Sequence, residues 1–378
     1  MTVEQDAAWP PLREALRGVQ PYGAPQLDVA VTLNVNENPY APSPTVVADI
    51  TAAVAAAAAT LNRYPDREFT ELRKGLAAYL SADAGPEKGS EIGPEMIWAA
   101  NGSNEVMLQL LQAFGGPGRT AVSFAPTYSM YPEYARNAMT GWIEGRRRSD
   151  FGFDLDEARR LIEEHRPTVV LLPSPNNPTG TALPREVVGE LCALLDRPGH
   201  RGVVVIDEAY AEFRREGTPS ALELLPQHRN LVVSRTMSKA FALAGARLGY
   251  LAAAPEICDA LRVVRLPYHL SAVTQAVACA ALRHSTELLG KVAELRAERD
   301  RTVEWLRAQG YQVAESDANF VLFGQFPDRQ DVWQQLLDQG VLIRVTGPDG
   351  WLRVSIGTAA EMTAFKDALR QATAEVTR

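Results

Sequence analysis

Short apolar runs recur along the middle of the chain, and each is followed by a polar loop. The runs are rich in β-branched residues, and several are continuously apolar, which is typical of strands buried on both faces of a sheet. Helical patterns separate the runs. We therefore expect a mainly parallel sheet between helices, built from MIWAA (96–100), TAVSF (120–124), TVVLLP (168–173), GVVVID (202–207), LVVS (231–234) and LGYLAA (248–253).

The two ends of the chain have different patterns. Residues 1–40 are rich in proline and turn residues, which predicts an extended arm rather than a folded unit. Helices are predicted at 45–59 and 68–80. A long helix at 287–309, ended by a glycine, is followed by a smaller α+β module with a helix between its first two strands. The apolar runs of that module are FVLF (320–323), VLIRV (341–345) and LRVSIG (352–357).

The composition is that of a globular protein. Of 378 residues, 46% are hydrophobic and 22% are charged, which excludes a disordered, collagen-like or coiled-coil chain. A net charge of −8 argues against nucleic acid as a partner, because a phosphate backbone attracts basic surfaces. A small-molecule enzyme and a large binding protein both fit these values.

Targeting and metal signals are missing from the sequence. We see no signal peptide and no run that could span a membrane, so no membrane contact is expected. The cysteines and histidines have neither disulfide nor metal-ligand spacing. We therefore expect a protein of the reducing cytoplasm without a metal site.

Ligands of parallel sheets bind beyond the carboxyl ends of the strands, so the loops after the runs are candidates for a site. Ser103 and Asn104 precede a predicted helix, where free N–H groups can hold a phosphate, although a capped helix start explains them at least as well. Tyr128 can stack on a flat ring or simply pack. Asn177 can donate to a phenolate oxygen, but a rigid turn accounts for most of its loop, residues 174–180.

Two further loops carry stronger chemistry. Asp207 ends a buried strand, where it can cap a helix or hold a protonated pyridine nitrogen, with Tyr210 near the same ring. A magnesium-binding acid is disfavoured because the sequence has no GxxxxGK[ST] loop. Lys239 follows another buried strand, where an amine can lose its proton and form a Schiff base with an aldehyde. The neighbours that suit a phosphate are Thr236, Ser238 and Arg247.

Taken together, these loops describe one ligand. It has a phosphate, an aldehyde, a basic ring nitrogen, a ring hydroxyl and a flat face. Those are the groups of pyridoxal 5′-phosphate, whose ring is an electron sink that the protein must tune. The sequence therefore predicts this cofactor.

Longer motifs surround these residues. They are PYGAPQLD (21–28), NENP (36–39), RYPD (63–66), NGSNE (101–105), PTYSMY (126–131), SPNNPTG (174–180), DEAYAEF (207–213), SRTMSKAFALAGARLGY (234–250), RLPYHLSAVTQ (265–275) and LRVSIGT (352–358). With them the chain resembles the histidinol-phosphate aminotransferases, which are aspartate-aminotransferase-like, fold-type I pyridoxal-phosphate enzymes. The likeness runs from about residue 22 to residue 358. Residues 345–350 depart from the family's pattern.

The resemblance implies a role for each candidate residue. Lys239 would carry the cofactor and act as the base in the proton shift, and Asp207 would pair with the pyridinium nitrogen. Asn177 and Tyr210 would contact the ring oxygen O3′, and Tyr128 would stack on the ring. The cofactor phosphate would be held by Ser103, Asn104, Thr236, Ser238 and Arg247. The substrate would be bound by Tyr22, Asn36, Tyr268, Arg344 and Arg353.

The resemblance also implies an assembly and a domain plan. Tyr64 would reach the partner subunit's cofactor phosphate, so we expect a homodimer with shared active sites. An arm (1–35) would precede a small domain made of 36–64 and 261–378. The large domain, 65–260, would be an α/β unit with a mostly parallel seven-stranded sheet. The expected reaction transfers the amino group of L-histidinol phosphate to 2-oxoglutarate, in histidine biosynthesis.

Other readings stay open at this point. Aromatic amino acid transamination and decarboxylation of an amino-acid phosphate occur on similar scaffolds, since a few pocket side chains set the substrate. A regulatory DNA-binding protein is disfavoured, because the chain begins almost at the arm and is acidic. We expect the arginines at 146–148 to form a solvated turn and His269 to be a packing residue.

Overall fold

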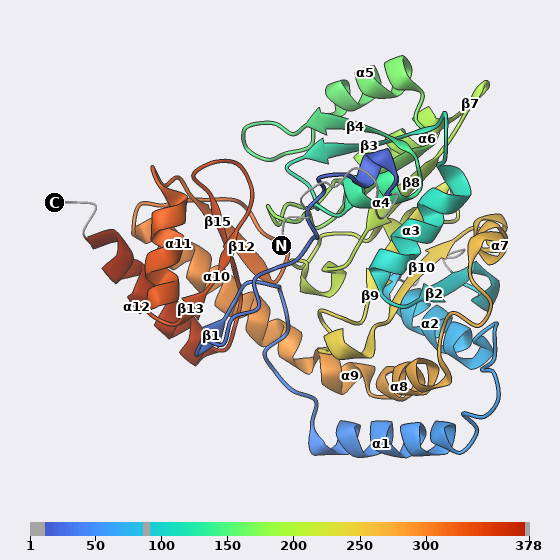
Figure 1. Ribbon diagram of the computed structural model, residues 1–378, viewed down its shortest axis with the longest axis horizontal. Coiled ribbons are helices and arrows are strands. Elements are labelled where there is room, and N and C mark those ends of the chain that lie inside the picture. Colours follow the sequence, from blue (N-terminus) through green and yellow to red (C-terminus); the bar gives the residue numbers. More distant parts are fainter. Residues whose placement is uncertain (1–11, 86–90, 375–378) are drawn as a thin grey trace.

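The computed structural model describes residues 12–85 and 91–374 of the chain. A seven-stranded sheet with its helices forms the larger part of the molecule, and a four-stranded sheet with its helices forms the smaller part (Figure 1). Residues 1–11 of the predicted arm and 375–378 of the predicted C-terminal domain lie outside the described residues. Within the described ranges, no helix is long and apolar enough to cross a membrane.

The large sheet confirms the predicted α/β class. Its strand order is β2-β10-β9-β8-β5-β3-β4. β10 is antiparallel to both of its neighbours, and every other pair is parallel. The strands are β2 (Ile97–Ala100), β3 (Thr120–Ala125), β4 (Gly141–Arg146), β5 (Val169–Pro173), β8 (Val203–Asp207), β9 (Leu231–Thr236) and β10 (Gly249–Ala253).

Strand β4 is missing from the sequence prediction. It lies at the edge of the sheet, carries several exposed residues and has no apolar run. The expected solvated turn at 146–148 is only partly right, because Arg146 and Arg148 are exposed but Arg146 pairs with β3 and Arg147 is buried. Arg146 ends β4, and the guanidinium of buried Arg147 donates to the carbonyl oxygens of Phe124 (3.3 Å) and Phe151 (3.4 Å).

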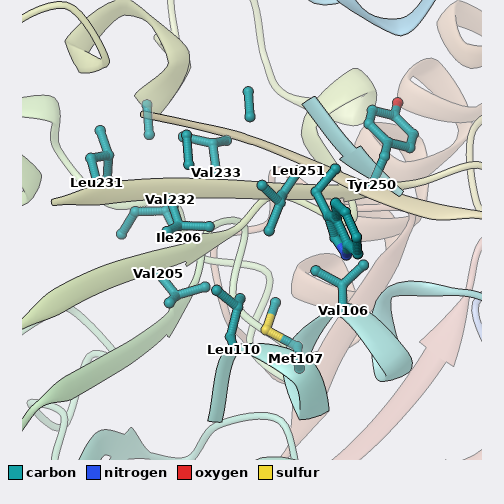
Figure 2. Close-up of a cluster of buried hydrophobic side chains, with 14 of the residues drawn as sticks. Val106, Met107, Leu110, Val205, Ile206, Leu231, Val232, Val233, Tyr250 and Leu251 are labelled. Carbon is teal, nitrogen blue, oxygen red and sulfur yellow. The ribbon is translucent and has the colours of Figure 1, made fainter. Parts of the chain in front are cut away.

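Helices pack on the large sheet through apolar faces. Figure 2 shows Val106 and Leu110 of α3 turned toward strand residues that include Val205 and Leu251, all of them fully buried. The predicted helices 45–59 and 68–80 correspond to α1, displaced by one residue, and to α2, displaced by two or three. The helices of this part are α1 (Pro44–Ala58), α2 (Thr70–Asp83), α3 (Ser103–Phe114), α4 (Tyr131–Asn137), α5 (Leu155–His165), α6 (Arg185–Leu195), α7 (Pro255–Val264) and α8 (Ala272–Arg283).

The smaller part contains the predicted α+β module. Its sheet has the order β11-β12-β15-β14. The strands are β11 (Gln312–Val313), β12 (Phe320–Gly324), β14 (Arg344–Val345) and β15 (Leu352–Ser355), and the helices are α10 (Val292–Ala308), α11 (Arg329–Asp338) and α12 (Ala359–Ala374).

Two local predictions for this module are wrong. The run 341–345 is not one strand, because β13 (Val341–Leu342) pairs with β1 (Val31–Thr32) of the N-terminal segment, whereas β14 pairs with β15. The helix predicted at 287–309 is interrupted after α9 (Ser285–Leu288) by a 3₁₀ turn that contains Gly290, a residue that disfavours an α-helix. The first of these differences ties the N-terminal segment to the small module.

Two main clusters of buried hydrophobic residues accompany the two sheets. Val46 of α1 and Ala278 of α8 belong to the cluster of the large sheet. Helices α1 and α8 also pack against each other. The division into an arm, a large domain and a two-piece small domain stays a prediction.

Candidate active site

A cavity of about 320 Å³ lies at the carboxyl ends of the large sheet's strands, and its wall includes side chains of the N-terminal segment and of β14 and β15. It brings together most of the residues that the sequence singled out. Tyr64 and Tyr268 do not line it. Those that do are Tyr22, Asn36, Ser103, Asn104, Tyr128, Asn177, Asp207, Tyr210, Thr236, Ser238, Lys239, Arg247, Arg344 and Arg353.

The pairing of β10 brings two of these loops together. Gly249, its first residue, lies opposite Ala100 at the end of β2 and opposite Thr236 at the end of β9. A Cβ atom on Gly249 would lie only 2.1 Å from the backbone nitrogen of Ser103. Because this position has no side chain, the first turn of α3 can approach the loop that carries Lys239.

One end of the cavity suits an anion. Ser103 begins α3, where backbone N–H groups lack helical partners. Thr236 Oγ1 donates a hydrogen bond to Ser238 Oγ at 3.0 Å. The guanidinium of Arg247 lies so close to Gly102 that a Cβ there would be 2.6 Å from Nη2. These hydroxyls, N–H groups and one cation are the donors that a phosphate needs.

Asp207 lies at the end of β8 with an incompletely paired carboxylate. Its Oδ2 accepts a hydrogen bond from the Tyr131 hydroxyl at 3.1 Å. Its Oδ1 is buried and has no hydrogen-bond partner among the described residues. Burial raises the pKa of Asp207 to about 6. A buried carboxylate oxygen without a donor is costly, so a protonated ring nitrogen would fit it well.

Lys239 lies in the loop after β9, and its side chain reaches the cavity. Its Nζ donates to the carbonyl oxygen of Val35 at 2.8 Å. Burial, with smaller contributions from Arg353 and Arg247, lowers the pKa of Lys239 to about 8, although Glu37 opposes the shift. A substantial fraction of this amine is therefore neutral in mildly alkaline solution, which is the form that attacks an aldehyde.

Two arginines from adjacent strands form the opposite wall. Arg344 and Arg353 are register partners in β14 and β15. Arg353 is buried, and it donates to Asn177 Oδ1 at 2.5 Å and to the carbonyl oxygen of Asn34 at 2.8 Å. Burial, with a smaller contribution from Arg344, lowers the pKa of Arg353 to about 10, although Tyr210 opposes the shift. No carboxylate of the described residues forms a salt bridge with either arginine, so this wall suits an anionic substrate.

The remaining wall carries hydroxyl and amide groups. Asn36 Nδ2 donates to the Tyr210 hydroxyl at 3.0 Å, and the Asn36 backbone N–H donates to Ser355 Oγ at 2.8 Å. Tyr22 is half exposed at the rim, where its hydroxyl accepts from Ser129 Oγ at 3.4 Å. Asn36 therefore links Tyr210 of the large sheet's loops to β15 of the small module.

Tyr64 and Tyr268 lie elsewhere on the surface. Their rings stack with the centroids 4.4 Å apart, and 79% of the surface of Tyr64 is exposed to solvent. The neighbouring His269 is a packing residue, as expected, because it stacks on Trp98 and its Nε2 is hydrogen-bonded to the Ala99 carbonyl oxygen.

Sequence reasoning missed some residues of the site. Tyr131, the hydrogen-bond donor to Asp207, lies within the quoted motif PTYSMY, but no local pattern marked it as a partner of Asp207. Thr346 also lines the cavity, although it belongs to the stretch that departs from the family pattern. The carbonyl oxygens of Asn34 and Val35 contact Arg353 and Lys239, and no side-chain pattern marks backbone acceptors.

Comparison with known proteins places this cavity in a family. The family model described as aminotransferase class I and II matches residues 29–369. The chain belongs to that family. Aminotransferases of this kind are pyridoxal-phosphate enzymes, so the predicted enzyme class and cofactor are confirmed. The free Asp207 Oδ1 and the amine of Lys239 fit that cofactor.

Curated relatives and solved structures agree with the aminotransferase family. The chain is 61% identical over 363 residues to the histidinol-phosphate aminotransferase of Thermobifida fusca. The matched region covers 96% of this chain and 95% of the relative. It is 55% identical over 372 residues to the enzyme of that name from Bifidobacterium longum, with 95% of each chain covered.

Two solved structures share the fold. That of histidinol-phosphate aminotransferase from Sinorhizobium meliloti, in complex with pyridoxal-5′-phosphate, has a TM-score of 0.83 at 23% identity and covers 98% of this chain and 99% of its own. That of aspartate aminotransferase from Thermus thermophilus with maleate has a TM-score of 0.76 at 27% identity, with 92% of each chain covered. The predicted aspartate-aminotransferase-like fold is confirmed.

Proposed function

We propose that this chain is a transaminase that moves the amino group of L-histidinol phosphate to 2-oxoglutarate and yields imidazole acetol phosphate and L-glutamate, a step of histidine biosynthesis. The single observation that carries the proposal is the cavity itself. It presents a reactive lysine and a carboxylate with one free oxygen opposite two adjacent arginines. Near-full-length identity to enzymes named for this substrate supports the choice.

The chain's own residues supply binding and proton transfer. When bound, pyridoxal phosphate supplies an aldehyde that captures the amino group and a ring that accepts an electron pair. Lys239 Nζ, as a neutral amine, would take up the proton of the substrate carbon and later give it back. Asp207 would hold the ring nitrogen in its protonated form, and Tyr210 and Asn177 would contact the ring oxygen.

The arginines account for two substrates in one cavity. A guanidinium binds a carboxylate and a phosphate with similar forked geometry. Arg353 would bind the carboxylate of glutamate in one half-reaction and the phosphate of histidinol phosphate in the other, with Arg344 adding positive charge beside it. Tyr22 and Asn36, which line the cavity, would complete the substrate pocket, whereas Tyr268 lies outside the cavity of its own chain. The amino donor and the keto acid are small molecules, as expected for this family.

The experiment that tests this function is a single-turnover absorbance measurement. The cofactor-loaded protein is mixed with L-histidinol phosphate alone, and the loss of its visible absorbance is followed as the cofactor takes up the amino group. Rapid loss with histidinol phosphate and not with phenylalanine or tyrosine is expected. If the visible absorbance is lost only with phenylalanine or tyrosine, the chain is an aromatic amino acid aminotransferase. Carbon dioxide release from an added amino-acid phosphate, which unlike histidinol phosphate carries a carboxyl group, would identify a decarboxylase.

The depressed pKa of Lys239 predicts a pH profile. We expect the rate at which the cofactor-free protein captures pyridoxal phosphate to rise with pH through a midpoint near pH 8, because the amine attacks only when unprotonated. Stopped-flow absorbance between pH 6 and pH 10 measures it. In Arg353→Gln the midpoint should move up, since a cation that disfavours the protonated amine is removed. A flat profile would contradict this assignment.

The assembly is also proposed, as a homodimer with shared active sites. Tyr64 stacks on Tyr268 outside the cavity of its own chain. Large apolar side chains close to these two tyrosines in the sequence are exposed, namely Leu61, Val263 and Leu266. Such exposed apolar groups favour a symmetric contact between two copies. A cytoplasmic location stays a prediction.

Tyr64→Phe should weaken cofactor binding if the partner's Tyr64 contacts the cofactor phosphate. Loss of one hydrogen bond to a charged group corresponds to an affinity lower by roughly 10-fold or more. Equilibrium titration of the cofactor-free protein measures it. Tyr311→Phe is the matched control, because its hydroxyl contacts only Thr373 among the hydrogen bonds found in the small module. Equal affinity of Tyr64→Phe and wild type would count against a shared site.

A further inference from the structure

Tyr131, the first residue of α4, is fully buried beneath the cavity and has no role in the function proposed above. Its hydroxyl donates to Asp207 Oδ2 at 3.1 Å. The other oxygen, Oδ1, stays free and buried. Because Asp207 lines the cavity, this arrangement leaves one carboxylate oxygen available to a ligand while the other is held from the protein side.

Two neighbouring tyrosines frame this contact. Tyr128 lines the cavity, and its ring meets the Tyr131 ring edge-on at 5.6 Å. The ring centroid of Tyr134 lies 6.4 Å from that of Tyr131, and the Tyr134 hydroxyl donates to Asn104 Oδ1 at 2.8 Å. Tyr131 and Tyr134, three apart in α4, share a face of the helix, and Tyr128 lies in the loop just before it. One short segment thus presents three rings to the ring-stacking, nitrogen-binding and phosphate-binding parts of the site.

We propose that Tyr131 is a positioning residue that turns the Asp207 carboxylate toward the pyridine nitrogen of the cofactor and keeps it ionised at neutral pH. The proposal rests on the proposed function, because it takes pyridoxal phosphate as the ligand of the cavity. Tyr131 acts through Asp207 and does not itself touch the ligand.

The hydrogen bond from Tyr131 matters because several groups around Asp207 shift the pKa of its carboxyl group. Burial raises the pKa of Asp207, and the adjacent Glu208 raises it further, whereas the Tyr131 hydroxyl and the Ala209 backbone N–H lower it. Tyr128, Tyr134 and Tyr210 face the carboxylate from their own elements as neutral hydroxyls. Burial and the carboxylate raise the pKa of Tyr131 far above its usual value, so Tyr131 remains a donor.

The test is the pH dependence of cofactor affinity in the cofactor-free protein. The dissociation constant of pyridoxal phosphate is measured by fluorescence titration from pH 5 to pH 8.5. In wild type, affinity should fall as pH is lowered through about 6, because protonated Asp207 no longer attracts the pyridinium. In Tyr131→Phe this fall should move to higher pH by about one unit, the shift that loss of a hydrogen bond to a charged group produces.

A matched control separates this effect from general weakening of the site. Tyr134→Phe, on the same helix, removes a hydroxyl that contacts Asn104 instead. The Tyr134→Phe variant should bind pyridoxal phosphate more weakly at every pH, and the pH at which its affinity falls should be the same as in wild type. A cofactor analogue with carbon in place of the ring nitrogen adds a second control, since Tyr131→Phe and wild type should bind it alike.

A fluorotyrosine at position 131 keeps the shape and makes the hydroxyl a stronger donor. The midpoint should then move to lower pH, which covers the case that Tyr131→Phe does not fold. A midpoint that stays at the wild-type value in the folded variant would overturn the proposal. Failure of the wild-type protein to bind pyridoxal phosphate would instead overturn the proposed function.

Discussion

Replacing Lys239 with alanine is expected to lower the single-turnover rate with histidinol phosphate by about 10⁴-fold or more. The substitution removes the amine that attacks the aldehyde and also the group that carries the proton, and proton transfer by a positioned side chain alone contributes up to about 10⁴-fold. Added alkylamines that enter the cavity should restore part of the rate. Stopped-flow absorbance of the cofactor-loaded variant is the measurement.

Cofactor binding should survive this change in part. Asp207, Thr236 and Arg247 still line the cavity and offer their groups to the ring and the phosphate. Lys74→Ala is the control, because Lys74 is an exposed residue that pairs with Glu71 on α2 and should leave the rate unchanged. A Lys239→Ala protein that turns over within 10-fold of wild type would show that another group performs the chemistry.

The second large effect is expected at Arg235, which is buried in β9 directly before Thr236. Its guanidinium donates to Glu208 Oε2 at 2.7 Å and 3.0 Å and to Asp83 Oδ2 at 2.6 Å. Glu212 also lies near it. Arg235→Leu should lower the free energy of unfolding by about 3–5 kcal/mol, because the carboxylates around it lose their buried partner. Urea unfolding followed by circular dichroism measures the change.

An exposed ion pair provides the control for this prediction. Arg370 and Asp367 pair on α12 with more than half of each side chain exposed. Pairs of that kind contribute about 0–1 kcal/mol, so Arg370→Leu should leave the unfolding midpoint nearly unchanged. An equal, small effect of both substitutions would mean that the Arg235 cluster does not stabilise the fold. Combining Arg235→Leu with Glu208→Gln should recover part of the lost stability.

The sequence by itself determined the fold class and most of the cavity wall. Continuous apolar runs must be buried on both faces, which requires a sheet between helices, and all but one of the seven strands were visible in that way. The carboxyl ends of parallel strands meet at one edge of a sheet. Asp207 and Lys239 therefore had to lie near each other, and the chemistry of the loops then indicated the ligand.

Only the tertiary structure decided how distant residues meet. The side chain of Arg353 donates to the carbonyl oxygen of Asn34, 319 positions away. Every residue has a backbone carbonyl oxygen, so the sequence does not indicate which one serves as an acceptor. Pairing with a distant segment divided the run 341–345 between two sheets, and the carbonyl oxygens of Phe124 and Phe151 accept hydrogen bonds from buried Arg147. Tyr131 begins α4, which packs against α3 and β4, and from there it reaches Asp207 at the end of β8. Local patterns record whether a residue is buried, whereas its partner depends on register and packing across the whole chain.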